Sequence, residues 1–410
     1  MKKITCIKIK KLLLVLAVFC FSACKELPEP EEFDPSDSRL HVVWNKPFLE
    51  ENTSAVMQDP ILADRYVAWA GYYQFTVGDL TNRIDVFDKT NGERHPAWRK
   101  NMEDDLGYGI RTFVVDDNSK DILYYTTSIA LHAIRISGGH RLWTSGFDED
   151  VHHYGNLSVL GSDATIPYYS RSSGACGVHR YYAPMRQKTN LFSFHTILST
   201  IQWAVNEHNN TVGFFFGGRN RYCYNLTQDS IVWECPISDY RDYPSFSPIV
   251  VENKYVLFQH KYDVSCIDFS TGELIWEKYV GYVEESPILY HEGKIIVRPH
   301  YGNISCYDVR NGDLLWTSTD VKLYLGRSAE YGKMDTYKGN LYFTNGGGNI
   351  FNPNFLYCIS LATGKVNWHD AGPNKGGILG GLVIDQQTGY LYCHSNWSVM
   401  CVDLNKTPKK

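Results

Sequence analysis

Most of the chain alternates between hydrophobic and polar residues in short runs, and turn sequences separate these runs. The clearest run starts with Val-Ser-Cys-Ile-Asp at 264–268, turns at Thr271-Gly272, and continues with Glu-Leu-Ile-Trp at 273–276. A period of two is typical of a half-buried β-strand, and glycine in the turn provides the positive φ of a tight hairpin. The pattern therefore predicts an all-β fold built from hairpins.

This hairpin is an internal repeat. Its clearest copies begin with cysteine, carry Thr-Gly or Asn-Gly in the turn and end with tryptophan, at residues 266–276, 306–316 and 358–368. Two further predicted strands precede each copy, as at 247–251 and 254–259. Four antiparallel strands in about 40–50 residues are typical of a β-propeller blade.

The tryptophans that close the hairpins give the number of blades. They occupy one position of the repeat, at Trp98, Trp143, Trp233, Trp276, Trp316 and Trp368. The gap between Trp143 and Trp233 is about twice the usual spacing. We therefore place a blade without tryptophan at 156–196, with Phe192 or Phe194 in the tryptophan position.

The two ends of the repeat region complete each other. The tryptophan strand at 40–46 has no blade of its own, and no tryptophan strand follows the last predicted strand at 398–404. Pairing these two strands closes the ring and removes exposed sheet edges. The sequence thus predicts an eight-bladed propeller of four-stranded antiparallel blades, with seven blades as the alternative if residues 156–196 are an insertion.

The first 38 residues do not fit the repeat. Residues 1–11 carry five lysines and no acid, and the apolar run at 12–21 is too short to span a bilayer, as in a signal peptide. Phe21-Ser22-Ala23-Cys24 resembles a lipobox, which directs lipid attachment to Cys24; an ordinary secretory signal is the alternative. We assign a lipoprotein signal peptide at 1–23, a lipidated flexible acidic tether at 24–38 and the propeller at 39–410. This predicts a bacterial outer-membrane lipoprotein, on either the periplasmic or the surface face.

Charge and cysteine content narrow the class of protein. The whole chain carries 40 basic and 45 acidic residues, and loss of the signal peptide leaves 35 basic against 45 acidic. This balance argues against a nucleic-acid partner, which needs a basic surface. Cysteines that share one repeat position lie too far apart to pair, so we expect buried free thiols at Cys223, Cys266, Cys306, Cys358 and Cys401. A Cys393–Cys401 disulfide is the alternative for the last of them.

The hairpins at 266–276, 306–316 and 358–368 resemble the repeat of PQQ-type propellers. That family includes quinoprotein dehydrogenases and eight-bladed lipoprotein scaffolds of the BamB type. The dehydrogenases carry a vicinal Cys-Cys pair, and this chain has no Cys-Cys dipeptide, so we expect no quinone and no other cofactor. The resemblance implies a non-enzymatic scaffold or binding protein with an envelope protein as its partner, although it leaves enzymatic activity undecided because one fold supports many functions.

Candidate binding residues follow the second strand of several blades. Such loops converge around the axis of a propeller, and they hold imidazoles, guanidinium groups and aromatic rings at Arg219, Arg221, His260, His300, Tyr301, His394 and Trp397. This rim is the predicted ligand site, whereas the opposite side should present only short Thr-Gly and Asn-Gly turns. We expect no metal there, because histidines on diverging blades do not converge on one ion. The alternative function is a surface lipoprotein that binds, or acts on, a carbohydrate or small ligand in this funnel.

Overall fold

The computed structural model describes the propeller strands and most of their connections. The described residues are 38–47, 54–76, 79–98, 112–116, 118–127, 129–153, 156–182, 187–194, 199–237, 247–283, 287–299, 303–321, 332–345, 354–373, 377–395 and 397–407. Residues 35–410 group into one compact unit. The proposed signal peptide, Cys24 and nearly all of the predicted tether lie outside the described residues. Within the described ranges, no helix is long and apolar enough to cross a membrane.

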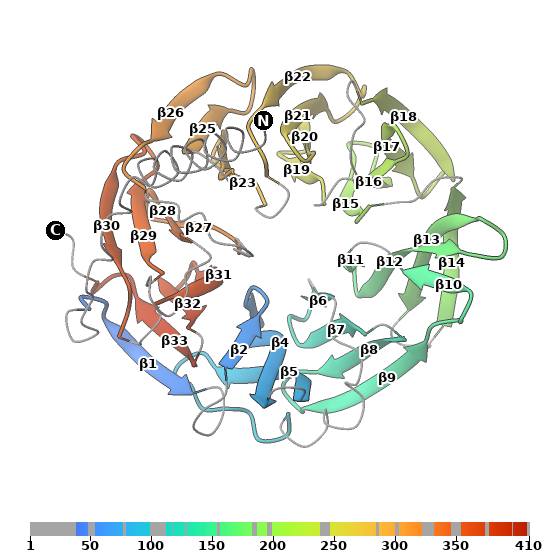
Figure 1. Ribbon diagram of the computed structural model, residues 1–410. Helices are drawn as coiled ribbons and strands as arrows, with labels where there is room; N and C mark the ends of the chain where they lie inside the picture. Colours follow the sequence, from blue (N-terminus) through green and yellow to red (C-terminus); the bar gives the residue numbers. More distant parts are fainter. Residues whose placement is uncertain are drawn as a thin grey trace, which may run out of the picture. The chain divides into compact units, whose positions relative to one another are not determined.

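Eight antiparallel sheets follow one another around a ring, and each sheet is one blade (Figure 1). The prediction of eight blades is therefore confirmed, and the alternative of seven is excluded. Blades 1 to 4 contain β2 (Ser54–Met57), β3 (Ile61–Leu62), β4 (Tyr66–Thr76) and β5 (Asp79–Asp88); β6 (Thr112–Val115), β7 (Ile122–Thr126), β8 (Ala130–Arg135) and β9 (His140–Gly146); β10 (Val151–His153), β11 (Ser158–Leu160), β12 (Asp163–Ser170), β13 (Cys176–Tyr182) and β14 (Gln187–Phe194); and β15 (Gln202–Val205), β16 (Thr211–Gly217), β17 (Asn220–Asn225) and β18 (Ser230–Pro236).

The remaining four blades repeat the same order of strands, from the innermost to the outermost. They contain β19 (Ile249–Val251), β20 (Tyr255–Gln259), β21 (Asp263–Asp268) and β22 (Leu274–Tyr279); β23 (Leu289–His291), β24 (Lys294–Val297), β25 (Ile304–Asp308) and β26 (Leu314–Ser318); β27 (Asp335–Tyr337), β28 (Asn340–Thr344), β29 (Leu356–Ser360) and β30 (Val366–Asp370); and β31 (Leu379–Asp385), β32 (Tyr390–His394), β33 (Ser398–Asp403) and β1 (Val42–Pro47).

The N-terminal strand closes the ring as predicted. Strand β1 pairs antiparallel with β33 and places Trp44 opposite Cys401. Blade 8 is thus assembled from the two ends of the propeller, and its outer strand is the first strand of the chain.

The blade without tryptophan is a true blade. Strands β12, β13 and β14 pair in order, and Phe192 lies opposite Val178, at the place where Trp233 lies opposite Cys223 in the next blade. Phe192 is buried and stacks on Tyr224 with ring centroids 4.2 Å apart. Phe192 therefore replaces the tryptophan. The inner position of this blade is split between β10 and β11, which the sequence pattern did not predict.

The repeat cysteine and the repeat tryptophan face each other across the two outer strands. Cys266, Cys306 and Cys358 lie opposite Trp276, Trp316 and Trp368, and each pairing is followed by a register shift. These cysteines are buried free thiols, as predicted. Cys393 and Cys401 are also free, and Cys393 pairs with Met400 in the sheet, so the alternative disulfide is not formed.

The tryptophans join neighbouring blades. The indole Nε1 atoms of Trp44, Trp98, Trp233, Trp276 and Trp316 each donate to the backbone carbonyl that follows the third strand of the next blade, at 2.8–3.1 Å. Each indole is also buried, which places the blade contacts in the core. Local hairpin chemistry thus determines how the blades stack.

Candidate functional site

Arg221, a predicted rim residue, lies in the contact between blades 4 and 5. It is 1% exposed. Its guanidinium donates to Glu277 on β22 of the next blade at 2.5 Å and to the carbonyl oxygen of Pro236 at 3.0 Å. A buried charge needs such partners, because removing it from water is costly. The interaction with Glu277 joins two blades.

The two described histidines of the predicted rim are buried. His260 is 6% exposed, and its backbone N–H donates to Asp263 at the turn between β20 and β21. The imidazole Nδ1 of His394 lies 3.2 Å from the carbonyl oxygen of Ser395, in the turn that follows β32. Burial lowers the pKa of His394 to about 4, so this imidazole is neutral at pH 7.

The other predicted rim residues differ in exposure or cannot be placed. Trp397 is 42% exposed, and Arg219 is exposed at the turn between β16 and β17. His300 and Tyr301 lie outside the described residues. The described residues come from blades 4, 5 and 8, and two of the five face solvent. Their role as one ligand site stays a prediction.

Two rim residues that the sequence analysis did not select tie the inter-blade connections in place. The amide of Gln259 donates to the carbonyl oxygen of Val283 at 2.6 Å and accepts from the N–H of Ile288 at 2.9 Å. Arg298, fully buried, donates to the carbonyl oxygens of Thr344 at 2.8 Å and Gly332 at 2.6 Å. Both directly follow an apolar second strand, and this abrupt change to a long polar side chain is the signal that could have identified them.

A further polar contact links blade 1 to blade 7. The Asp59 carboxylate accepts from the backbone N–H of Lys333 at 3.1 Å. Burial raises the pKa of Asp59, while the positive charges of Lys333 and Arg298 oppose that rise. This buried network holds inner parts of blades on both sides of the ring closure.

Blade 3 carries a pair of histidines that the sequence analysis also missed. Nε2 of His153 lies 3.2 Å from Nδ1 of His179, which is the distance of a hydrogen bond between two imidazoles. His153 belongs to β10, next to the connection from blade 2, and His179 belongs to β13. The pair can form only because β10 adds to the inner side of β12, a pairing that alternation along the chain does not predict.

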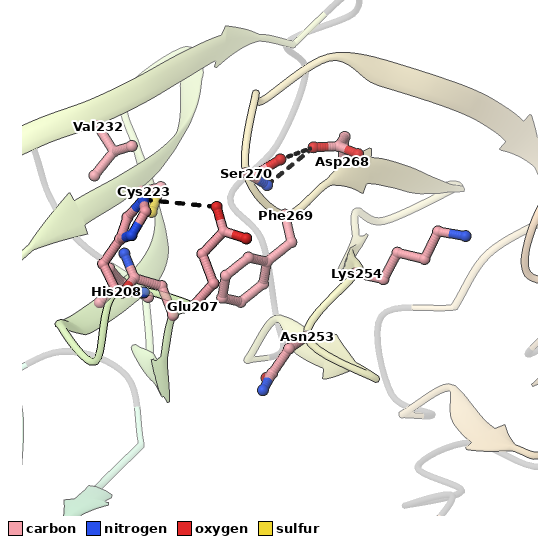
Figure 2. Close-up of a pocket in the computed structure, with 11 residues that line it drawn as sticks. Glu207, His208, Cys223, Val232, Asn253, Lys254, Asp268, Phe269 and Ser270 are labelled. Carbon is pink, nitrogen blue, oxygen red and sulfur yellow. Dashed lines mark hydrogen bonds and ion pairs between the residues drawn. The ribbon is translucent and has the colours of Figure 1, made fainter.

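A pocket of about 440 Å³ lies on the opposite side of the ring, between blades 4 and 5. Figure 2 shows Glu207 and His208 on one side of it and Asn253 and Lys254 on the other, with the phenyl ring of Phe269 between them. The wall from blade 4 is the turn at 206–210, closed by a hydrogen bond of 2.9 Å from the N–H of Asn210 to the side-chain oxygen of Asn206. This turn is longer than the two-residue turns expected on this side, which is why a hollow forms there.

The floor of this pocket is apolar and chemically inert. Val212, Cys223 and Phe269 are buried beneath the polar walls. Burial raises the pKa of the Cys223 thiol to about 12, so the nucleophilic thiolate is absent at neutral pH. The pocket is thus suited to contact rather than to covalent chemistry.

Comparisons with known proteins place this architecture. Residues 243–370, which include blades 5 and 6 and most of blade 7, match the PQQ-repeat family model described as outer membrane protein assembly factor BamB. No curated protein matches the chain. In fold, the chain is similar to BamB from Moraxella catarrhalis, with a TM-score of 0.55, 14% identity, and coverage of 89% of this chain and 98% of that one.

Two other solved propellers are similar in fold alone. The computationally designed protein Ika8 has a TM-score of 0.63 and 11% identity, and covers 89% of this chain and 100% of its own. Sqt1 from Saccharomyces cerevisiae has a TM-score of 0.62 and 10% identity, with 88% and 99% covered. Fold likeness at this identity does not transfer a function. The repeat, the eight blades and the match at residues 243–370 together identify the chain as a PQQ-like-repeat β-propeller of the BamB type.

Proposed function

We propose that this chain is a non-enzymatic outer-membrane lipoprotein that acts as a scaffold or binding protein and holds an envelope protein partner through its propeller loops. The observation that carries this proposal is the match of residues 243–370 to the family model of an outer membrane protein assembly factor. The likeness of the whole ring to BamB supports it, since it extends over 98% of that chain. The carbohydrate or small-ligand alternative has no support from these comparisons.

The exposed side chains of the rim support contact with a protein. Trp397 and Arg219 are of the two residue types most enriched at the energetic centres of protein interfaces, and both face solvent on loops. Their neighbours Arg221 and Gln259 are fixed by hydrogen bonds to the next blade or connection. A rigid base under exposed anchors lowers the entropy lost on binding.

In vivo photocrosslinking tests this proposal. A crosslinking amino acid placed at 397 or 219 should yield one or more discrete adducts with membrane proteins, identified by mass spectrometry. The same amino acid at Lys365, exposed in the turn between β29 and β30, is the matched control on the opposite side. Adducts that are absent at 397 and 219, or equally strong at 365, would contradict docking at the rim loops.

A further inference from the structure

The His153–His179 pair lies within the contact between blades 2 and 3. Tyr168 of β12 stacks on His179 with ring centroids 3.9 Å apart, and Phe147 covers His153 at the same distance. On the far side of His179, Tyr181 stacks on Trp143 of blade 2 at 6.3 Å. The two imidazoles thus belong to an aromatic stack that runs from the blade 2–blade 3 connection into the interface.

The surrounding charges come from three segments. Asp148, in the connection between β9 and β10, forms an ion pair of 2.6 Å with Lys188 of β14. His152 neighbours His153 on β10, while Tyr168, Tyr181 and Trp143 bring no charge at neutral pH. Asp148 is the one described acid that favours protonation of both imidazoles, whereas Lys188 opposes it for both.

This environment keeps both imidazoles neutral at pH 7. Burial, and then the charge of His179, lower the pKa of His153 to about 3. Burial, and then the charge of Lys188, lower the pKa of His179 to about 4. A neutral pair can share one N–H···N hydrogen bond, but two imidazolium rings have no acceptor between them and repel at 3.2 Å.

We propose that the His153–His179 pair is an acid-sensitive joint, which holds the connection at residues 147–153 against blade 3 when both rings are neutral and releases it when they are protonated. Release separates β10 from β12, because His153 is the last residue of that short pairing. The short β10 strand has three paired residues, so little else opposes its departure. Acid thereby exposes the aromatic stack at the rim between blades 2 and 3.

The direction of the effect follows from proton linkage. The opened state has ordinary imidazoles with a pKa near 6.5, whereas the closed state binds protons only near pH 4 or below. The opened state therefore takes up more protons as the pH falls from 6.5 to 4, and acid favours opening. Above pH 6.5 the joint should be insensitive to pH.

Hydrogen–deuterium exchange of the full-length protein in detergent tests the joint. After correction for the intrinsic exchange rate, protection of peptides within 147–153 should fall at least about tenfold between pH 6.5 and 4.5. Protection of β20 and β24, in blades 5 and 6, should stay constant over that range. His153→Gln and His179→Gln keep a polar group but cannot be protonated, so either variant should reduce the local loss of protection.

Two further variants separate a local joint from general acid unfolding. His208→Gln alters a histidine that is 75% exposed in blade 4, and His394→Gln removes a buried one in blade 8. Neither should change the pH dependence of exchange at 147–153. The proposal is overturned if that exchange does not respond to acid, if it always follows exchange of β20 and β24, or if the Gln variants at 153 and 179 behave like wild type.

Discussion

The indole Nε1 of Trp276 in blade 5 donates a hydrogen bond of 2.8 Å to the backbone carbonyl of Val309 in blade 6. Because the same contact recurs in other blades, we expect it to contribute much of the stability of the ring. Trp276→Ala should lower the free energy of unfolding by about 3–5 kcal/mol, as for a large core cavity. Urea unfolding monitored by circular dichroism measures it. Trp397→Ala, at an exposed position, should stay within about 0.5 kcal/mol of wild type; equal effects would show that Trp276 is not a core residue.

Gly312 lies in the turn against which Trp276 packs. Its φ is +68°, and a Cβ there would lie 2.8 Å from Cδ2 of the indole. Gly293 has a similar φ of +77°, but no atom would lie within 4 Å of its Cβ. Both Gly→Ala variants should cost about 1–2 kcal/mol from backbone strain, and Gly312→Ala about 1–3 kcal/mol more from overpacking. Equal losses of thermal stability in the two variants would contradict a tight contact between turn and indole.

Lipid attachment at Cys24 is tested by fractionation. Cys24→Ser removes the thiol that would carry the lipid, so the protein should move from the membrane to the soluble fraction. Immunoblotting of both fractions measures the shift, with Cys20→Ser in the signal peptide as the control. Retention of the Cys24→Ser variant in the membrane would refute the lipobox interpretation. Protease treatment of whole cells would then distinguish the periplasmic from the surface face.

His394 should make stability depend on pH. Burial lowers its pKa to about 4 in the folded state, below the value near 6.5 expected when unfolded. Its contribution is therefore fully present above pH 6.5 and is lost as the pH falls towards 4, by up to about 3 kcal/mol. His394→Gln should flatten this part of the stability profile, measured by urea unfolding from pH 7.5 to 4.5, whereas His208→Gln should not. Parallel profiles for wild type and His394→Gln would contradict a buried neutral imidazole.

The blades could be predicted because each one repeats the same local chemistry. A Thr-Gly or Asn-Gly turn and a closing tryptophan are visible within about ten residues, and they also create the contact with the next blade. Even Phe192 could be placed, since the spacing of the tryptophans left room for one blade. Regular turns and a two-residue period carry this information without knowledge of distant contacts.

The site could not be predicted in the same way, because its properties depend on which neighbour meets each side chain. Arg221 and His394 occupy loop-side positions in the sequence, yet the next blade or a turn buries them. The pairing of His153 with His179 requires β10, a strand made from an inter-blade connection. Turn length at 206–210 was readable, but the hollow behind it depends on blade 5.

The contact between Arg221 and Glu277 separates a structural role from a ligand-binding role. Arg221→Met leaves Glu277 without its cation in a site where the arginine side chain is 2% exposed and the glutamate 21%. Breaking one partner of such a pair should cost about 3–5 kcal/mol, whereas the double variant Arg221→Met, Glu277→Leu should recover most of this loss. Chemical denaturation of the four proteins gives the coupling energy directly.

The same double variant tests the rim as a binding surface. If Arg221 serves only to join blades 4 and 5, restored stability should restore crosslinking at position 397 as well. If Arg221 contacts the partner, the double variant should be as stable as wild type but give at least about tenfold weaker crosslinking, since a buried arginine at an interface contributes more than 1 kcal/mol. The geometry favours the first outcome, because the guanidinium already donates to Glu277 and Pro236. A stable double variant that does not crosslink would return Arg221 to the binding site.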